Sequence, residues 1–476
     1  MYVRINDYVM FRKYNEYGLL TDNSMFGYRI AGDEERYPGE KYVSESGAIM
    51  LEILNKEPQH IDSIVDKLMA IFIGVERDEL KKDVVDFFKQ FIDEGFLISA
   101  QTYDECANPV KNENAGTLKN NANTIVESCN KYIIGENDFL RSLHIEVASE
   151  CNERCVHCYI PHEYKNSTIS TDLFYKIVEE GREMNIINVT LSGGEPLLHK
   201  DFVKLLAKCR KLDLSVNVLS NLTLLSDEVI EEMIKNPLLC VQTSIYSMDA
   251  DIHDSITQVK GSLDKTKEAL LKLKELEIPV QISCPVMKQN MNTFNDVITW
   301  GNENNIGVSV DYVIFASYDH SGCNLKNRLS VDEVKSVFES QLSSDYVETL
   351  QESVKENLEL KKDNPVCSVC KYYLCVSANG DAFPCVGWQS KVLGNLNTQT
   401  VHDVWNNSNE VKELRSIKRS SFPKCVECKD RGYCKVCMMS NSNENIDGDE
   451  FKINDYHCQV AAMIHSTVDS YINSKK

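Results

Sequence analysis

The sequence predicts an α/β protein: a partial barrel of six strand–helix units, with a small α+β domain before it and a cysteine-rich domain after it. Three observations lead to this fold class. Between residues 139 and 330, apolar strand-like segments alternate with helical ones, and such repeats build a parallel sheet covered by helices. Residues 1–100 carry short segments rich in Tyr, Val and Ile, followed by three amphipathic stretches. Residues 367–476 hold nine of the eighteen cysteines.

Composition excludes several classes of protein. The 476 residues are 42% hydrophobic, which is enough to bury a sizeable core. Asp and Glu (72) outnumber Lys and Arg (51), and the net charge of −21 argues against nucleic acid or an anionic membrane as the main partner. The chain has no apolar run of about 18 residues and no apolar segment near its start, so we expect a cytoplasmic protein without a secretory signal. In that reducing compartment the cysteines act as thiols, metal ligands or catalysts.

Residues 1–100 fit a winged-helix-like α+β domain. The first half predicts strands near residues 2–10, 18–22 and 25–30. Three helical stretches follow, at 46–56, 61–72 and 77–94. The last of them places five apolar side chains on one face: Leu80, Val84, Phe87, Phe88 and Phe91. The domain contains 12 basic and 19 acidic residues, a balance that opposes binding to DNA phosphates.

The remaining chain divides into a linker, the barrel, a bridge and the cysteine-rich domain. An Asn-rich stretch in residues 101–138 predicts a solvated linker that separates the first domain from the barrel. Six units make a partial barrel, whose ligands bind where the strands end. Residues 331–366 form a charged helical bridge, and metal is the expected organiser of residues 367–476 because apolar segments are few there. The strand candidates of the barrel are 143–148, 187–191, 214–219, 240–246, 278–284 and 308–315.

The first cysteine cluster directly follows the first barrel strand. Cys151, Cys155 and Cys158 stand as CNERCVHC, a C-x₃-C-x₂-C spacing. Three thiolates from one loop suit three irons of a four-iron cluster and leave the fourth iron open to a substrate or cofactor. A three-thiol zinc site and ordinary buried cysteines are the alternatives for this spacing alone.

Further polar or flexible motifs follow the next two strands. Ser192-Gly193-Gly194-Glu195-Pro196 ends the second strand, where glycines permit close approach of the backbone to a ligand. The third strand ends in Ser220 and Asn221, at the same expected rim. The three-cysteine motif after one strand and GGEP after the next together resemble the radical S-adenosylmethionine (radical SAM) superfamily.

This resemblance implies a fold, a cofactor set and candidate ligands. Cys151, Cys155 and Cys158 would bind a [4Fe–4S] cluster whose open iron takes the amino and carboxylate groups of SAM. The candidates in the GGEP motif would contact the methionine part of SAM, and those at the end of the third strand would contact its ribose. Weaker candidates lie on later strands. His157 departs from the pattern, because an aromatic residue is usual before the third cysteine. The SAM-binding candidates are Gly193, Gly194, Glu195, Ser220, Asn221 and Ser244, with residues 283–286 as a further segment.

The second cysteine cluster contains repeated Cys-x₂-Cys pairs, which are strong metal-site signals. By spacing alone zinc and iron–sulfur are equally good interpretations. Behind a radical SAM core the pattern resembles the SPASM domain, which carries two auxiliary [4Fe–4S] clusters. The resemblance implies two sets of ligands: Cys367, Cys370, Cys385 and Cys437 for cluster I, and Cys425, Cys428, Cys434 and Cys458 for cluster II.

Two departures from the SPASM pattern affect cluster I. Cys434 and Cys437 are separated by two residues where three are usual. Cys375 is surplus, and it either replaces Cys370 or leaves cluster I with one open iron. The fourth ligand of cluster I is therefore left open between these alternatives.

Ahead of such an enzyme, residues 1–100 resemble the RiPP recognition element, a winged-helix module that binds the leader of a ribosomally made precursor peptide. The leader would add a strand near residues 25–30 and pack on the helix at 77–94. The segment Ile245–Asp249, with His253, Asp254, Thr257, Gly261 and Ser262, resembles thioether-forming maturases of the sactipeptide and ranthipeptide type.

The resemblances together imply a cytoplasmic enzyme that uses SAM and three [4Fe–4S] clusters to install thioether crosslinks in a leader-bearing peptide. A flavodoxin- or ferredoxin-type protein would supply electrons. Carbon–carbon crosslinking, epimerisation and sulfatase-type maturation are alternative reactions, and a peptide-binding iron–sulfur sensor is the non-enzymatic alternative. No catalytic side chain is singled out by the sequence, and Asp249 and His253 have simple interpretations as a turn and a helix cap.

Overall fold

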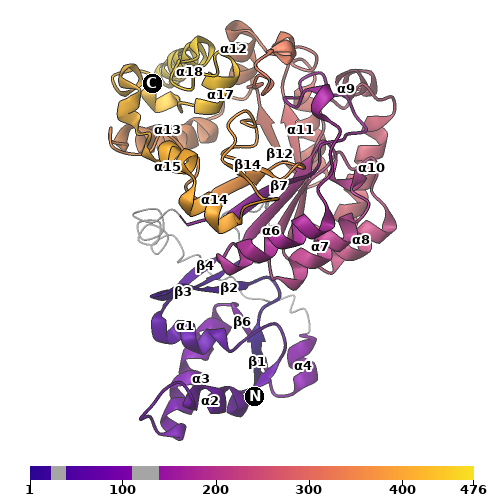
Figure 1. Ribbon diagram of the computed structural model, residues 1–476. Coiled ribbons are helices and arrows are strands. Elements are labelled where there is room, and N and C mark those ends of the chain that lie inside the picture. The colour runs from indigo at the N-terminus through magenta and orange to yellow at the C-terminus, as the bar shows by residue number, and fades with distance from the viewer. Residues whose placement is uncertain (23–38, 110–138, 476) are drawn as a thin grey trace.

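The computed structural model describes residues 1–22, 39–109 and 139–475. An N-terminal domain lies at one end of the molecule, a large sheet with flanking helices occupies the middle, and the C-terminal segments cover the far end (Figure 1). The predicted strand at 25–30 and the Asn-rich stretch at 111–124 fall outside the described residues. Within the described part of the chain, no helix has the length and apolar character needed to cross a bilayer.

The N-terminal domain combines two small sheets with three helices. One sheet has the order β5 (Gln59–His60), β1 (Tyr2–Ile5), β6 (Leu97–Ala100); the other has the order β2 (Met10–Lys13), β3 (Tyr17–Thr21), β4 (Glu40–Ser44). The helices are α1 (Glu45–Glu52), α2 (Ile61–Met69) and α3 (Arg77–Asp93). On α3 the predicted apolar face is buried at Leu80, Val84, Phe88 and Phe91, and Phe87 packs at its margin.

Two local predictions in this domain need correction. The single strand expected at 2–10 is divided into β1 and β2, because the Val9 amide bonds back to the Asn6 carbonyl in a turn. The start of the expected linker forms a short helix, α4 (Tyr103–Ala107), with a capping box between Thr102 and Glu105. The buried Arg4 donates to the carbonyl of Cys106 at 2.7 Å and so fixes α4 to β1.

The central sheet confirms the predicted run of six parallel strands. On β7, Leu143, Ile145 and Val147 are buried in the apolar core beneath the helices. Since side chains alternate along a strand, His144 and Glu146 face the opposite side, the barrel lumen. The strands are β7 (Ser142–Ala148), β8 (Asn188–Gly193), β9 (Ser215–Leu219), β10 (Leu239–Ser244), β11 (Val280–Pro285) and β12 (Gly307–Asp311).

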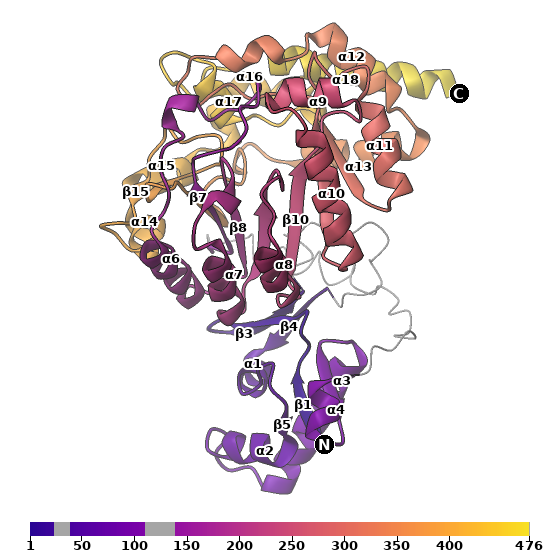
Figure 2. The ribbon, with the colours of Figure 1, turned by 90° about the vertical axis from the view of Figure 1, so that its right-hand side faces the viewer.

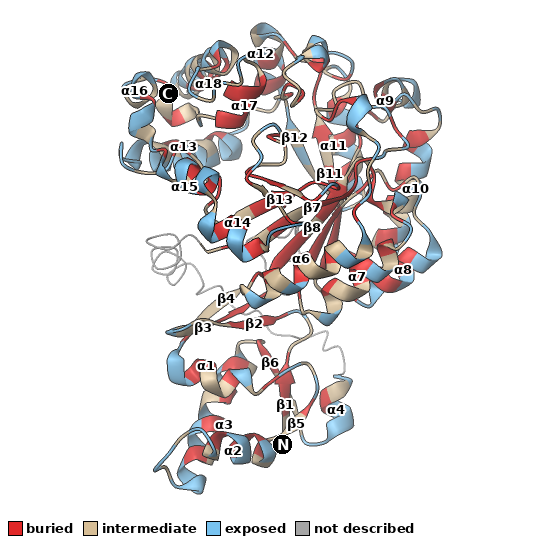
Figure 3. Cartoon of the chain, in the orientation of Figure 1, coloured by how far each residue is buried: buried red, intermediate tan, exposed pale blue. Residues whose placement is uncertain are grey.

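Helices follow most of these strands and cover the outer face of the sheet (Figure 2), so the buried strands lie inside the molecule (Figure 3). They are α6 (Thr171–Glu183), α7 (Phe202–Lys211), α8 (Asp227–Ile234), α9 (Ala250–Thr257), α10 (Ser262–Glu275) and α11 (Phe294–Glu303). The predicted bridge forms α12 (Val331–Ser340) and α13 (Ser344–Glu359).

The C-terminal region is joined to the barrel by the sheet itself. Strand β13 (Tyr373–Val376) pairs in parallel with β7, and β14 (Asp381–Phe383) and β15 (Gly394–Asn395) follow in antiparallel order. Trp388 and Trp405 are fully buried in the same apolar core as the barrel residues, so this region does not depend on a separate core. Its helices are α14 (Val401–Asn407), α15 (Asn409–Ser416), α16 (Pro423–Val426), α17 (Met438–Asn443) and the unforeseen 21-residue α18 (Asp455–Lys475).

The N-terminal domain docks on the end of the barrel where the strands begin, which we call the barrel floor. Arg12 of β2 has no exposed side-chain surface and donates to the carbonyl of Ile186 at 3.0 Å and to both the carbonyl and the carboxylate of Asp213. The Asn185 amide donates to the carbonyl of Lys13 at 2.9 Å. Arg141 and Glu40, both largely buried, form an ion pair at 3.1 Å.

Candidate active site and iron–sulfur sites

The three-cysteine loop begins immediately after β7, at the carboxyl end of the sheet. Burial raises the pKa of Cys151 to about 11. Burial also raises the pKa of Cys155 well above its usual value, and Glu153, Cys158 and Cys151 raise it further, so the three sulfurs lie within electrostatic reach of one another. Three thiols from one loop are a suitable donor set for an iron–sulfur cluster, and cation binding is what keeps such buried thiols deprotonated. Among the described residues, no three Cys, His, Asp or Glu side chains are already placed to hold a single metal ion.

The two glycines of the GGEP motif meet the backbone of this cysteine loop. The Gly194 amide donates to the Ala148 carbonyl and the Glu195 amide to the Glu150 carbonyl, each at 2.8 Å. A Cβ added at Gly194 would lie 2.3 Å from the carbonyl oxygens of both Ser149 and Glu150. The sequence explained these glycines by approach to a ligand, whereas the structure gives a second reason: two backbones pass too closely for a side chain.

Glu195 links the second and third strand ends. Its fully buried carboxylate accepts from the Ser220 hydroxyl at 2.7 Å, the Asn221 amide at 2.8 Å and the Leu197 amide at 3.0 Å. Burial raises the pKa of Glu195 to about 7. The Asn221 side chain also donates to Asn152 of the cysteine loop at 2.9 Å. The structure thus gathers four of the predicted cofactor residues, Gly194, Glu195, Ser220 and Asn221, at the rim beside the cysteine loop, and their contacts with SAM remain a prediction.

Tyr246 is a neighbour of the cysteine loop whose role the sequence did not identify. Its hydroxyl lies 4.0 Å from the Cys155 sulfur, and its ring meets those of His157 and His253 at centroid distances of 5.1 and 5.3 Å. The predicted residue Ser244 lies at the end of β10 and hydrogen-bonds the Tyr246 hydroxyl. These rings close the side of the loop that faces β10.

Side chains in the segment that resembles thioether-forming maturases make local structural hydrogen bonds in this chain. Asp249 caps the N-terminus of α9, accepting from the Asp251 amide at 2.9 Å, as its simple interpretation predicted. Asp254 accepts from the Ser262 hydroxyl at 2.9 Å and from the Gly261 amide. This resemblance therefore gains no catalytic side chain from the structure.

Polar residues line the lumen between the cysteine loop and the C-terminal region. Glu146 is buried and accepts from the Gln389 amide at 2.6 Å, and burial raises its pKa to about 7. His144 hydrogen-bonds Ser192 across the sheet, and burial lowers its pKa to about 4. Tyr159 lies within electrostatic reach of Glu146, Cys158 and two C-terminal cysteines. None of these residues was predicted from the sequence, although the alternation of SLHIEVA along β7 carried the signal for His144 and Glu146.

The C-terminal cysteines separate into two groups in space. Burial raises the pKa of Cys437 to about 11, and Cys385 and Cys367 raise it further. Burial raises the pKa of Cys434 to about 12, and the thiols that raise it further are Cys458, Cys425 and Cys428. The second group contains the four cysteines that the SPASM resemblance implies for cluster II, whereas the first contains three of the four implied for cluster I. Both ligand sets remain predictions. Cys370 and Cys375 both lie near the first group.

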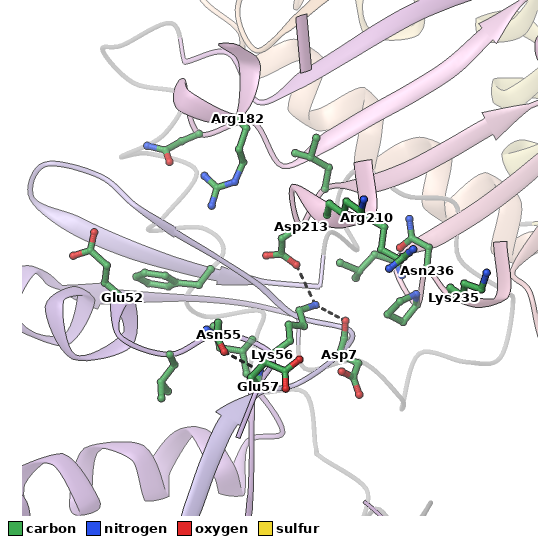
Figure 4. A pocket seen from close by; sticks show the side chains of 18 of the residues that line it. Asp7, Glu52, Asn55, Lys56, Glu57, Arg182, Arg210, Asp213, Lys235 and Asn236 are labelled. Atoms are coloured by element: carbon green, nitrogen blue, oxygen red, sulfur yellow. Dashed lines mark hydrogen bonds and ion pairs between the residues drawn. The ribbon is translucent and has the colours of Figure 1, made fainter. Parts of the chain in front are cut away.

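A cavity of about 660 Å³ lies elsewhere, between the N-terminal domain and the barrel floor (Figure 4). Lys56 points into it and binds the carboxylate of Asp213 at 3.1 Å and the carbonyl of Asp7 at 2.6 Å. Most of the charged side chains that line the cavity have ion-pair or hydrogen-bond partners, as Lys56 does. It is at the opposite end of the barrel from the cysteine loop, so it is separate from the candidate active site.

Three family models match successive parts of the chain. The radical SAM superfamily matches residues 145–301, an iron–sulfur cluster-binding domain called SPASM matches 367–430, and coenzyme PQQ synthesis protein D (PqqD) matches 37–97. These ranges contain the cysteine loop, most of the C-terminal thiols and helices α1 to α3, respectively.

Relatives and solved structures extend the likeness. A PqqA peptide cyclase from Bradyrhizobium diazoefficiens is 24% identical over 317 residues, covering 61% of this chain and 80% of that protein. The subtilosin biosynthesis protein AlbA from Bacillus subtilis is 24% identical over 358 residues, covering 72% and 77%. The fold resembles SuiB from Streptococcus suis, crystallised with its precursor peptide SuiA, with a TM-score of 0.60 and 16% identity over 96% of this chain and all of SuiB.

The domain matches and the site geometry agree on the cofactors. A radical SAM domain uses a [4Fe–4S] cluster and SAM, and a SPASM domain binds auxiliary iron–sulfur clusters. Two spatial groups of thiols in the C-terminal region have the composition that auxiliary clusters require. This chain therefore contains a radical SAM domain, which lies between a PqqD-type domain and a SPASM domain.

Proposed function

We propose that this radical SAM enzyme modifies a leader-bearing precursor peptide and closes an intramolecular thioether between a peptide cysteine and a carbon of another residue. The observation that carries the proposal is the position of the C-terminal thiol group that contains Cys367, Cys385 and Cys437. Cys385 lies within electrostatic reach of Tyr159, and so does Cys158 of the three-cysteine loop. A site for thiolate chemistry and a site for radical chemistry thus border one lumen.

The chain's own residues organise the radical site. Cys151, Cys155 and Cys158 would hold a [4Fe–4S] cluster, which together with SAM would supply radical chemistry able to remove hydrogen from carbon. Glu195, which follows β8, positions the rim by accepting hydrogen bonds from Ser220 and Asn221 at the end of β9. The glycine pair holds β8 against the cysteine loop. Buried side chains around the lumen exclude water, which protects a reactive radical.

The N-terminal domain is the proposed peptide-binding module. The PqqD match and the net acidic sequence of the domain favour a peptide over DNA. SuiB, which shares the fold, was crystallised with its precursor peptide, and AlbA is a biosynthesis protein of the bacteriocin subtilosin. A leader held by this domain raises the local concentration of the core peptide at the barrel. A flavodoxin- or ferredoxin-type protein is the proposed reductant.

The mass of the product tests the reaction. Each thioether removes one hydrogen from the thiol and one from carbon, so the peptide loses two hydrogens per bridge and one cysteine becomes resistant to iodoacetamide. A carbon–carbon link gives the same mass loss but leaves every cysteine reactive, and epimerisation leaves the mass unchanged apart from solvent deuterium. Mass spectrometry before and after alkylation separates the three, and fully alkylatable cysteines in the product would refute the thioether.

A further inference from the structure

Residues 418–435, which we call the basic segment, are cationic in a chain that is otherwise strongly acidic. They contain six Lys or Arg residues and two acidic ones, whereas the whole chain contains 51 and 72. Three lysines stand directly beside cysteines of the second C-terminal thiol group, which we call group II. These neighbours are Lys424 and Cys425, Cys428 and Lys429, and Cys434 and Lys435. Cationic side chains and group II thiols are therefore interleaved along the segment.

Helix α18 brings the fourth thiol of group II, Cys458, to this segment. The His465 ring stacks on Tyr433 at a centroid distance of 4.6 Å, and its Nδ1 lies 2.7 Å from the Asp430 carboxylate. Cys458 precedes His465 by about two helical turns, so both side chains lie on the same face of α18. Cys458 is exposed, and α16, which contains Cys425, lies at the end of the molecule opposite the N-terminal domain (Figures 2 and 3). Group II is thus a surface site.

The chain itself does not neutralise the positive charges of the basic segment. Four lysines of the segment are exposed and, within the described part of the chain, pair with no carboxylate: Lys418, Lys424, Lys429 and Lys435. Asp430 is engaged by His465, and Glu427 and Asp455 are the exposed acidic residues closest in sequence to the group II cysteines. Like charges that lack a counter-charge raise the local potential, so this surface attracts an anionic partner.

The three-cysteine loop has the opposite balance of charge. Between residues 149 and 165, glutamates outnumber Lys and Arg by three to two. Iron–sulfur centres receive single electrons, so a carrier protein must approach one of the thiol sites. An acidic carrier meets net negative charge at the loop and net positive charge at group II. Electrostatic steering therefore directs an acidic carrier to the basic segment.

We propose that the basic segment, together with the group II thiols that it surrounds, is the docking surface for an acidic one-electron carrier of the flavodoxin or ferredoxin type. On docking, one electron leaves the reduced carrier and enters the iron–sulfur centre held by these thiols, and no covalent bond forms or breaks. Such electron-transfer encounters have small interfaces and gain their speed from charge complementarity. The inference rests on the protein reductant of the proposed function and is independent of the product that the enzyme makes.

The rate at which the loaded enzyme oxidises reduced flavodoxin, followed by anaerobic stopped flow, tests the docking surface. Wild type is compared with the triple variant Lys424→Glu, Lys429→Glu, Lys435→Glu. At about 0.1 M salt, where charges more than about 10 Å apart are largely screened, we expect this variant to react about 10-fold more slowly. At about 1 M salt the rates should converge, since the Debye length falls to about 3 Å.

A second triple variant is the matched control. Lys82→Glu, Lys89→Glu and Lys265→Glu change the net charge equally at exposed positions on α3 and α10, and this variant should react at the wild-type rate. Iron content and dithionite-driven cleavage of SAM, which needs no docking, should be the same in all three proteins. Equal rates in the two variants would overturn the proposal. So would loss of iron or equal slowing with dithionite in the first variant, because the lysines would then act on the cluster itself.

Carbodiimide crosslinking of the wild-type enzyme to flavodoxin gives a readout without any substitution, because the reagent joins lysine amines to carboxylates. We expect the crosslinked lysines to lie in the basic segment and the yield to fall with added salt. Crosslinks at Lys165 beside the three-cysteine loop instead, or no salt-sensitive crosslink, would refute docking at group II. If the product lacks a thioether but these results hold, the proposed reaction fails and the docking surface stands; a thioether product with flavodoxin crosslinked elsewhere has the opposite meaning.

Discussion

Arg12 should control how firmly the peptide-binding domain is held on the barrel. Its guanidinium is fully buried at the barrel floor and donates to the carbonyls of Ile186 and Asp213 as well as to the Asp213 carboxylate. Burial lowers the pKa of Arg12 to about 10, so it stays charged at neutral pH. In Arg12→Ala the carbonyls of Ile186 and Asp213 lose a charged donor, while the Asp213 carboxylate, a third exposed, keeps its ion pair with Lys56. Leaving a buried acceptor without its partner typically costs about 1–3 kcal/mol, so two such carbonyls cost about 2–6 kcal/mol.

That loss predicts a specific pattern of defects. Since 1.4 kcal/mol is a factor of ten, the equilibrium between docked and undocked domains should change by roughly 30- to 10⁴-fold. We expect faster amide hydrogen exchange in β2 and in the turns before β8 and β9, together with slower modification of a full precursor. SAM cleavage without peptide should persist, because the cysteine loop lies at the opposite end of the sheet.

Lys13→Ala is the matched control on the same strand. Lys13 pairs with Glu52 at 2.6 Å, but both side chains are well exposed, and such pairs contribute about 0–1 kcal/mol. Its backbone contact with Asn185 is unaffected by the substitution. Wild-type exchange protection and wild-type precursor modification in Arg12→Ala would show that docking does not depend on this residue.

Two further predictions concern the SAM site. Gly194→Ala places a Cβ 2.3 Å from two carbonyl oxygens and must displace the cysteine loop by about 1 Å, so formation of 5′-deoxyadenosine should fall about 100-fold, whereas Gly307→Ala, with nothing within 4 Å, should not affect it. Changing Cys151, Cys155 and Cys158 together to Ala should abolish that reaction and remove about a third of roughly 12 irons. Anaerobic iron analysis checks the second prediction, and zinc in place of the remaining iron would contradict the assignment of the C-terminal sites.

Local patterns predicted much of the fold and of the site. Apolar segments at regular spacing located all six parallel strands. The near-continuous apolar signal of strands buried on both faces fits the earlier strands best, since β11 is buried on one face only and β12 has no buried residue. The cysteine loop and the GGEP motif were found in the same way. The role of Glu195 was not predicted, because its partners Ser220 and Asn221 come from another strand end. Arg12 was missed for the same reason, since its partners lie 174 and 201 positions away and no periodicity connects them.

The domain order in the sequence predicted that a linker separates the N-terminal domain, which recognises the peptide, from the barrel, which carries the chemistry. The structure instead docks the first unit on the barrel floor through a buried arginine, so deleting residues 1–100 would expose that floor. Point variants such as Arg12→Ala are therefore a cleaner test of leader recognition than a truncation. The linker itself remains a prediction, because most of it lies outside the described residues.

The junction between barrel and C-terminal region shows why sequence boundaries can mislead. Without β13, the edge of β7 would present unpaired backbone groups beside the reactive lumen. The four residues of β13 fill that edge in register from Ser142 to Ile145, although they come more than 200 positions later and are too few to reveal a partner in the sequence. One continuous sheet thus carries the first cysteine loop at the end of β7 and Cys375 beside His144. The placement of Cys375 relative to the first cysteine loop is consequently set by backbone hydrogen bonds, and a substitution that loosens β13 should disturb both together.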